Sequence, residues 1–258
     1  MIEPWVGNST TPTLVTSIQS YCGYTVCDNG TVCGGFSSAC ESFFPAAAAL
    51  GVRNELNLDS GNCSIAAYRA LWADTTASPA ALLAAAIAAN ASGWNIDLEP
   101  QADNCAGSPT GTSADAAAFA AWLAAVRAVL AQRGIRLTVD VANWSPVLRE
   151  FATLAPAVDR LQDMETYNGD SEAEWLGYYA PLVAVQPRSV AGVGLGCWDD
   201  GKGAWWETPA GAAAKVSRAI SDGMQELALF RLDPDTGGAE WPFVYWWPTL
   251  QAFVAPRK

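Results

Sequence analysis

Strand-like and helix-like segments alternate along most of this chain, and that alternation limits the folds that it can adopt. Short runs of aliphatic and β-branched residues recur, and the segments between them carry helix start and stop signals. Ser78-Pro79 combines an N-cap residue with proline at the first helical position, and Gly134 ends the long helix that Ser113 begins. Alternation of this kind predicts a parallel sheet covered by helices.

The predicted strands favour a barrel. Trp5-Val6 is a candidate for a short strand in addition to seven longer ones, which are 17–21, 52–58, 93–99, 136–142, 161–167, 189–196 and 226–232. In 258 residues without a visible linker, this predicts an α/β fold, a (β/α)8 TIM barrel with a short or irregular first strand, as a single domain over residues 1–258. A doubly wound open sheet is the alternative, but we find no GxGxxG or Walker-type loop to support nucleotide binding.

The net charge and the lack of histidine argue against several classes of function. The formal net charge is −12, and the chain has no histidine. Nucleic-acid binders normally carry a basic face, and histidine is the common zinc ligand and general base. We therefore expect no nucleic-acid partner, no metal and no cofactor, with acid–base chemistry left to Asp, Glu, Tyr, Lys or Cys. No apolar run reaches the length of a membrane span, so we also expect no membrane insertion.

The cysteines indicate disulfides. Four of the seven lie close together in sequence, and no pair has the CxxC spacing of a zinc site. We expect these four to pair locally in one of three connectivities; they are Cys22, Cys27, Cys33 and Cys40. We expect Cys63 to bridge Cys105, because their loops follow neighbouring strands, and Cys197 to be free.

Asn-x-Ser/Thr sequons, like disulfides, are typical of proteins in oxidising compartments. They make candidate glycosylation sites of Asn8, Asn29, Asn62 and Asn90, whereas Asn143 follows a predicted core strand and is set aside. Disulfides and sequons together predict an oxidising compartment, so the protein is expected to be secreted, extracellular, or lysosomal or vacuolar.

The segment GWNIDLE, 93–99, has polar residues at alternate positions of a predicted strand. Asn95, Asp97 and Glu99 share one side, whereas a strand buried on both faces should be apolar throughout. Barrel active sites gather at the C-terminal ends of the strands, where Glu99 would lie with Asp97 one layer below. Crowded, buried carboxyls raise the pKa of at least one of them, which makes a proton donor. The alternative is an antiparallel strand with a solvated polar face.

This segment resembles the DGxDxDxE signature of the chitinase-like glycoside hydrolase family 18 at Gly93, Asp97 and Glu99. Asn95 and Ser92 stand where the family has Asp. Glu165-Thr166-Tyr167-Asn168 resembles the family's sixth-strand motif, and GVGLG at 192–196 its seventh strand. The segment LTVDVANWSP is similar to the fifth strand of the di-N-acetylchitobiase branch. Two departures stand out: NLDSG at 57–61 replaces the SxGG motif, and Phe230 takes the place of the eighth-strand Trp.

The resemblance implies retaining, substrate-assisted hydrolysis of β-linked N-acetylglucosamine glycosides, either chitooligosaccharides or N-glycan cores. It implies that Glu99 protonates the leaving oxygen, that Asp97 orients the substrate's acetamido group, and that Tyr167 donates its hydroxyl to that group. Further candidate substrate-binding residues are Asn95, Asp140, Trp144, Glu165, Asn168, Trp198 and Phe230. The alternatives are a weakly active or inactive chitinase-like lectin and a structural extracellular glycoprotein.

Overall fold

The computed structural model describes residues 16–60, 64–100, 111–167, 169, 171–196, 208–230 and 247–254. The strands are β1 (Ser17–Val26), β2 (Val32–Gly34), β3 (Arg53–Asp59), β4 (Gly93–Asp97), β5 (Arg136–Val141), β6 (Arg160–Asp163), β7 (Ala191–Gly196) and β8 (Glu226–Phe230). The helices are α2 (Ser38–Ala49), α3 (Ile65–Ala73), α4 (Ala77–Ala88), α5 (Ser113–Ala131), α6 (Phe151–Leu154), α7 (Glu172–Ala184), α8 (Pro209–Ser221) and α9 (Trp247–Val254). Short 3₁₀ helices are η1 (Ala155–Ala157), η2 (Glu165–Tyr167) and η3 (Arg188–Val190).

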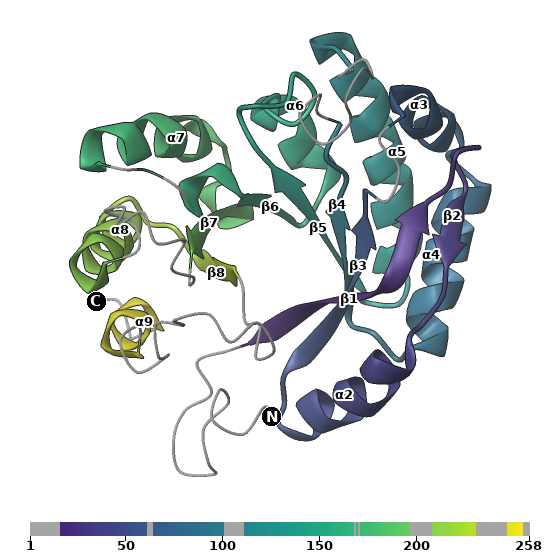
Figure 1. Cartoon of the computed structure of the whole chain (residues 1–258), viewed down its shortest axis with the longest axis horizontal. Coiled ribbons are helices and arrows are strands. Elements are labelled where there is room, and N and C mark those ends of the chain that lie inside the picture. Colours follow the sequence, from purple (N-terminus) through teal and green to yellow (C-terminus); the bar gives the residue numbers. More distant parts are fainter. Residues whose placement is uncertain are drawn as a thin grey trace.

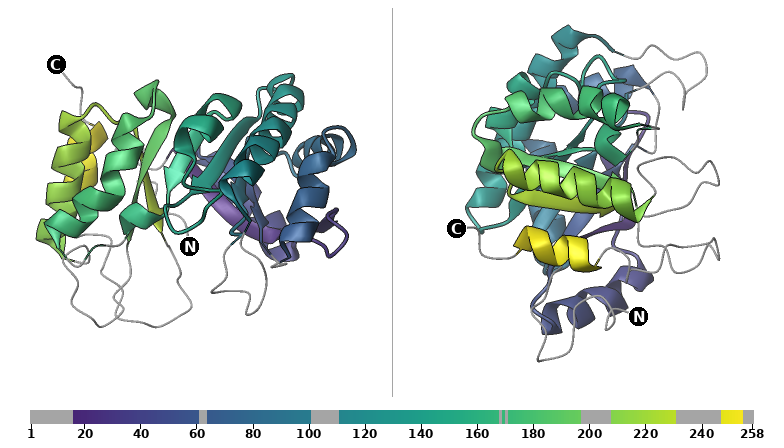
Figure 2. Two further views of the ribbon diagram at one scale, coloured as in Figure 1. Left: turned by 90° about the horizontal axis from the view of Figure 1, so that it is seen from above. Right: turned by 90° about the vertical axis from the view of Figure 1, so that its left-hand side faces the viewer.

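The strands form one curved sheet in the order β2-β1-β3-β4-β5-β6-β7-β8. β1 and β3 to β8 run parallel to their neighbours, and β2 is antiparallel to β1. Figure 1 shows the helices around the outside of this sheet, and Figure 2 shows α8 and α9 packed side by side beyond β8. The seven longer strands of the sequence prediction are therefore confirmed, together with the parallel sheet.

The described residues do not form the closed barrel that the sequence predicted. β8 and β1 make no strand pair in this part of the chain, so the sheet is a curled half-barrel compatible with a TIM-barrel-like fold. Trp5-Val6, the candidate additional strand, lies outside the described residues. Closure depends on pairing between strands far apart in sequence, which local patterns do not encode.

β2 is a strand that the sequence did not predict. It lies in the cysteine- and glycine-rich loop after β1 and returns against it, with Val26 opposite Val32. Two disulfides hold this region, Cys22–Cys40 and Cys27–Cys33. Local pairing is confirmed, and the structure selects one of the three connectivities; the two disulfides indicate an oxidising compartment. Cys63, Cys105 and Cys197 lie outside the described residues.

α5 supplies much of the core on the outer side of the sheet. Its residues Phe119, Trp122 and Leu123 are fully buried, as their helical spacing predicts. The Trp122 indole donates to Ser78 on α4 at 2.9 Å. By length and composition α5 is apolar enough to cross a membrane, as is the bent pair α3–α4, which corrects the expectation that no apolar run has this length. In the fold, the buried face of α5 packs on its neighbours.

Candidate functional site

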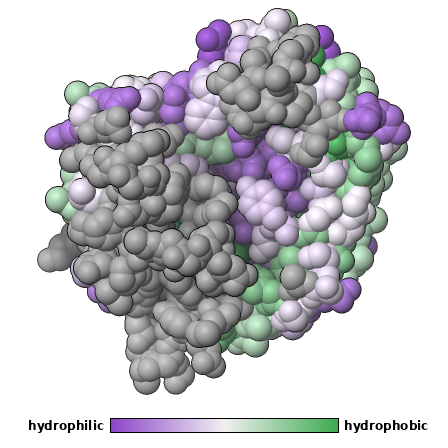
Figure 3. Space-filling view, viewed as in Figure 1, coloured by the Kyte–Doolittle hydropathy of each residue, from purple (hydrophilic) through white to green (hydrophobic). Residues whose placement is uncertain are grey.

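β4 places its alternating polar residues on the concave side of the sheet. Asn95 and Asp97 are 1 % and 4 % exposed, and Glu99 lies half-buried just past the end of the strand. Trp94 points the other way and donates to the Leu82 carbonyl on α4. β4 pairs in parallel with both β3 and β5, so the antiparallel alternative for this segment is wrong. Hydrophilic side chains gather near the centre of the face drawn in Figure 3, over the middle of the sheet.

Asp97 is held by a tyrosine from β1. The Tyr21 hydroxyl donates to Asp97 Oδ2 at 2.7 Å, although Tyr21 as a residue is 57 % exposed. An irregularity between Ser20 and Tyr24 interrupts the β1–β3 register, and bulges of this kind re-aim side chains beside active sites. Burial is the main cause that raises the pKa of Asp97, the Asp59 charge adds to it, and the Tyr21 hydrogen bond opposes both.

Glu99 has the electrostatics of a proton donor. Burial raises the pKa of Glu99 to about 7, with further contributions from the charges of Asp97 and Asp59. Its backbone N–H donates to the Ser60 hydroxyl at 2.7 Å, and that hydroxyl donates to the Asp97 carbonyl at 3.2 Å. The NLDSG segment, which replaces the SxGG motif, therefore supplies both an anchor and a nearby charge for Glu99.

Tyr167 lies on η2, directly after β6, and is 6 % exposed. Gln162 on β6 donates to the Tyr167 hydroxyl at 3.1 Å and exchanges hydrogen bonds with Gln19 on β1. The Tyr167 ring packs against the backbone of Gly194 on β7, where a Cβ would overlap the ring. Burial, followed by the Asp140 charge, raises the pKa of Tyr167, so the hydroxyl keeps its proton.

Asn95 and Asp140 form the layer below. Asn95 Nδ2 donates to Asp140 Oδ2 on β5 at 2.8 Å. Burial and the Asp97 charge raise the pKa of Asp140 well above its ordinary value. The charges of Asp97 and Asp140 both act on Tyr167, so the structure brings these predicted residues together with Glu99.

Of the remaining predicted residues, Glu165, Trp144 and Phe230 are among those that the structure describes. Glu165 accepts from the Asn143 backbone N–H at 2.9 Å and so fixes the loop after β5. Trp144 in that loop is 39 % exposed. Phe230 is the last residue of β8, and Asn168 and Trp198 lie outside the described residues.

A buried ionic layer lies at the opposite ends of the strands. Arg160 on β6 contacts Glu226 on β8 at 2.8 Å and Glu55 on β3 at 3.6 Å, and Arg136 on β5 contacts Glu226 at 2.6 Å. Arg160 and Glu55 are almost fully buried. These contacts join β3, β5, β6 and β8 across the concave side of the sheet, below the candidate site.

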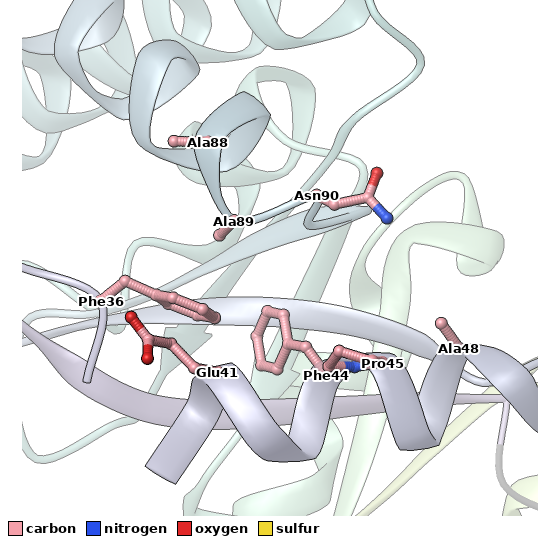
Figure 4. A pocket seen from close by; sticks show the side chains of 8 residues that line it. All are labelled: Phe36, Glu41, Phe44, Pro45, Ala48, Ala88, Ala89 and Asn90. Carbon is pink, nitrogen blue, oxygen red and sulfur yellow. The ribbon is translucent and has the colours of Figure 1, made fainter. Parts of the chain in front are cut away.

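An apolar pocket of about 300 Å³ lies apart from these groups, between α2 and the end of α4 (Figure 4). None of the predicted catalytic residues lines it. The residues around it are Phe36, Glu41, Phe44, Pro45, Ala48, Ala88, Ala89 and Asn90. The sequon residue Asn90 is exposed at its rim.

Sequence reasoning missed Tyr21, Asp59, Ser60 and Gln162. No local pattern distinguishes Tyr21 and Gln162 from ordinary strand residues, whereas Asp59 and Ser60 lie in NLDSG, the segment that replaces the SxGG motif. Asp59 also lies opposite Asp97 in the β3–β4 register, and this pairing together with the altered motif would have identified it.

The fold is similar to that of several chitinases of known structure. Similar solved structures include a chitinase from Chromobacterium violaceum, with 16 % identity, a TM-score of 0.71, and coverage of 94 % of this chain and 92 % of that one. A class V chitinase from Pseudomonas fluorescens has 13 % identity and a TM-score of 0.67, covering 93 % and 92 %. An Ostrinia furnacalis Group IV chitinase in complex with allosamidin has 15 % identity and a TM-score of 0.62, covering 84 % of each chain.

These likenesses concern the fold. They confirm, at that level, the resemblance to the chitinase-like family 18 that the β4 and β6 motifs predicted. A scan against protein-family models finds no match, and a search of curated proteins finds none either. The assignment to the di-N-acetylchitobiase branch stays a prediction.

Proposed function

We propose that this protein is a retaining glycosidase that hydrolyses β-linked N-acetylglucosamine units, in chitooligosaccharides or N-glycan cores, with the substrate's acetamido group as nucleophile. The observation that supports this most directly is Glu99, a carboxyl at the end of β4 with a pKa of about 7. Such a carboxyl is largely protonated in mildly acidic solution, as a general acid requires.

In this mechanism Glu99 donates its proton to the glycosidic oxygen as the bond from that oxygen to the anomeric carbon breaks. The acetamido oxygen bonds to the anomeric carbon and forms an oxazolinium ion. Glu99, now a carboxylate, takes a proton from water, whose oxygen attacks the anomeric carbon and expels the acetamido oxygen. The product keeps its anomeric configuration, and Glu99 regains its proton.

Asp97 is suited to receive the acetamido N–H. Tyr21 occupies its Oδ2, and an Asn57 side chain close enough to hydrogen-bond favours the ionised form of Asp97, but no donor among the described residues has normal hydrogen-bond geometry toward its buried Oδ1. A buried acceptor without a donor is destabilising, and a substrate N–H would satisfy it. The Tyr167 hydroxyl would donate to the acetamido oxygen, and Asn95 with Asp140 would support Asp97 from below.

The test is hydrolysis of a fluorogenic N,N′-diacetylchitobioside between about pH 4 and 7 by the wild type and Glu99→Gln. We expect the substitution to lower kcat by about 10²- to 10⁴-fold, the usual contribution of a general acid. Glu172→Gln makes the same change on the exposed face of α7 and should leave kcat unchanged. Wild-type turnover by Glu99→Gln would show that Glu99 is not the acid.

A sugar-binding lectin is the second candidate, and Asn95 favours it. An amide bonded to Asp140 cannot share a proton with Asp97 as the family's aspartate would. Calorimetric titration with chitooligosaccharides and with allosamidin distinguishes the two. Micromolar binding without hydrolysis by the wild type would support the lectin, and neither binding nor hydrolysis would favour a structural extracellular glycoprotein.

A further inference from the structure

A lysine on the outer helix α8 is buried behind the segment that carries Tyr167. Lys215 is 1 % exposed, whereas the other buried residues of α8 are apolar, among them Ala212, Val216 and Ala219. Burying an ammonium group is costly unless it gains compensating interactions. The contacts of the Lys215 ammonium group therefore indicate why a lysine is buried here.

Those contacts converge on η2. Lys215 Nζ donates to the carbonyl oxygens of Thr166 at 3.3 Å and of Tyr167 at 3.4 Å. The ammonium group also lies 5.7 Å from the centre of the Trp175 ring on α7, and the indole N–H of Trp175 donates to the same Thr166 carbonyl at 3.1 Å. Two outer helices thus bind the last carbonyls of η2.

A helix of three residues cannot hold these carbonyls itself. The last carbonyls of any helix lack partners within it, and in η2 they belong to Thr166 and Tyr167. The Thr166 hydroxyl accepts from the Gly194 N–H at 2.8 Å, which ties the same turn to β7. Since the Tyr167 ring lies against Gly194, the direction of that ring depends on where the η2 backbone is held.

We propose that Lys215 is a positioning residue for Tyr167. By binding the two η2 carbonyls from outside the sheet, it fixes the backbone from which the Tyr167 hydroxyl reaches the site. The role rests on the proposed function, in which that hydroxyl binds the acetamido oxygen. A displacement of about 1 Å in a catalytic arrangement can lower the rate by about 100-fold, so a loosened η2 should be visible in kcat.

The first experiment compares Lys215→Met with Val216→Ala. Methionine keeps most of the length of the side chain but cannot donate to carbonyls, and Val216→Ala removes buried atoms from the same helix while leaving both Lys215 hydrogen bonds to η2 in place. We expect Lys215→Met to lower kcat on the fluorogenic chitobioside by about 10-fold with a smaller change in KM. Val216→Ala should lower the melting temperature and leave kcat within about twofold of the wild type.

The decisive comparison repeats Lys215→Met in a Tyr167→Phe background. If the lysine acts through the tyrosine hydroxyl, its substitution has no further effect once that hydroxyl is gone. A lysine that only stabilises the fold would lower kcat by the same factor in both backgrounds, and this result would overturn the proposal. If Lys215→Met does not fold, Lys215→Gln replaces it, with a smaller loss expected because the amide can still donate.

A measurement without substrate separates this inference from the proposed function. Hydrogen exchange of a peptide covering residues 164–167 should be faster in Lys215→Met and unchanged in Val216→Ala. Unchanged exchange in Lys215→Met would overturn the inference whatever the activity. A wild type that does not hydrolyse the substrate would refute the proposed function, and the catalytic half of the inference with it, even where the exchange result shows that Lys215 holds η2.

Discussion

The pH profile of hydrolysis tests how the site sets the pKa of Glu99. Burial is the main cause of its value of about 7, and the charges of Asp97 and Asp59 add to it. At pH 6 a carboxyl with this pKa is about 90 % protonated, whereas one at the ordinary 4.5 is about 3 % protonated, so the site supplies about 30-fold more of the acid. Asp59 is exposed at the end of β3, so it can be neutralised without disturbing the core.

We expect Asp59→Asn to lower the pKa of Glu99 by about 0.1 to 0.7, because an exposed charge pair contributes about 0.2–1 kcal/mol and one pKa unit corresponds to about 1.4 kcal/mol. Removing a negative charge favours the ionised form of Glu99. The alkaline limb of kcat/KM should therefore move to lower pH by that amount, measured with the fluorogenic chitobioside between about pH 4 and 9. The displacement should shrink in about 0.5 M NaCl, which screens exposed charges.

Glu172→Gln, which removes the same charge from α7, is the matched control and should leave the limb in place. An alkaline limb that stays fixed or moves to higher pH in Asp59→Asn would refute the electrostatic reasoning. A limb that moves equally in both variants would show that net charge, rather than the neighbour of Glu99, determines the profile.

Three further predictions concern groups around the site. Tyr21→Phe removes the donor to Asp97 and should lower kcat/KM by about 10-fold in the same assay, with little change in melting temperature; unchanged kcat/KM would contradict this role. Cys22→Ser opens a disulfide with a sequence separation of 18 and should lower the free energy of unfolding by about 3 kcal/mol in a denaturant titration; reduction of the wild type also opens Cys27–Cys33 and should lower it by at least as much. Arg160→Met leaves the buried carboxylate on β3 without its cation and should cost about 3–5 kcal/mol in the same titration; a loss below about 1 kcal/mol would show that the ion pair is not needed.

Most strands could be predicted because their apolar runs are long enough to be recognised in the sequence. Seven of them were located from such runs, and α5 from its helical period. β2 has three residues, too few for any period, and it exists because β1 and two disulfides hold it in place. β8 and β1 do not pair among the described residues; such pairing joins segments far apart in sequence, and local patterns do not contain it.

The candidate site could be predicted only where a residue's polarity differs from the polarity expected at its position in the fold. Asp97 is an acidic residue on a strand that should be apolar, so the sequence alone singled it out together with Glu99. Tyr21 and Lys215 fit the local patterns of a strand end and a helix, so the sequence did not identify them as site residues. Their places follow from a bulge in one case and from the packing of α8 behind η2 in the other.

Gly194 exposes the site to evolutionary loss through a residue that has no functional group. A single methyl at this position would occupy the space of the Tyr167 ring, while Glu99 and Asp97 remained in place. One nucleotide change from glycine to alanine would therefore displace the tyrosine without touching either carboxyl. In a lineage of such proteins, intact Asp97 and Glu99 are therefore not sufficient evidence of activity, and the residue on β7 that faces the tyrosine must be examined as well.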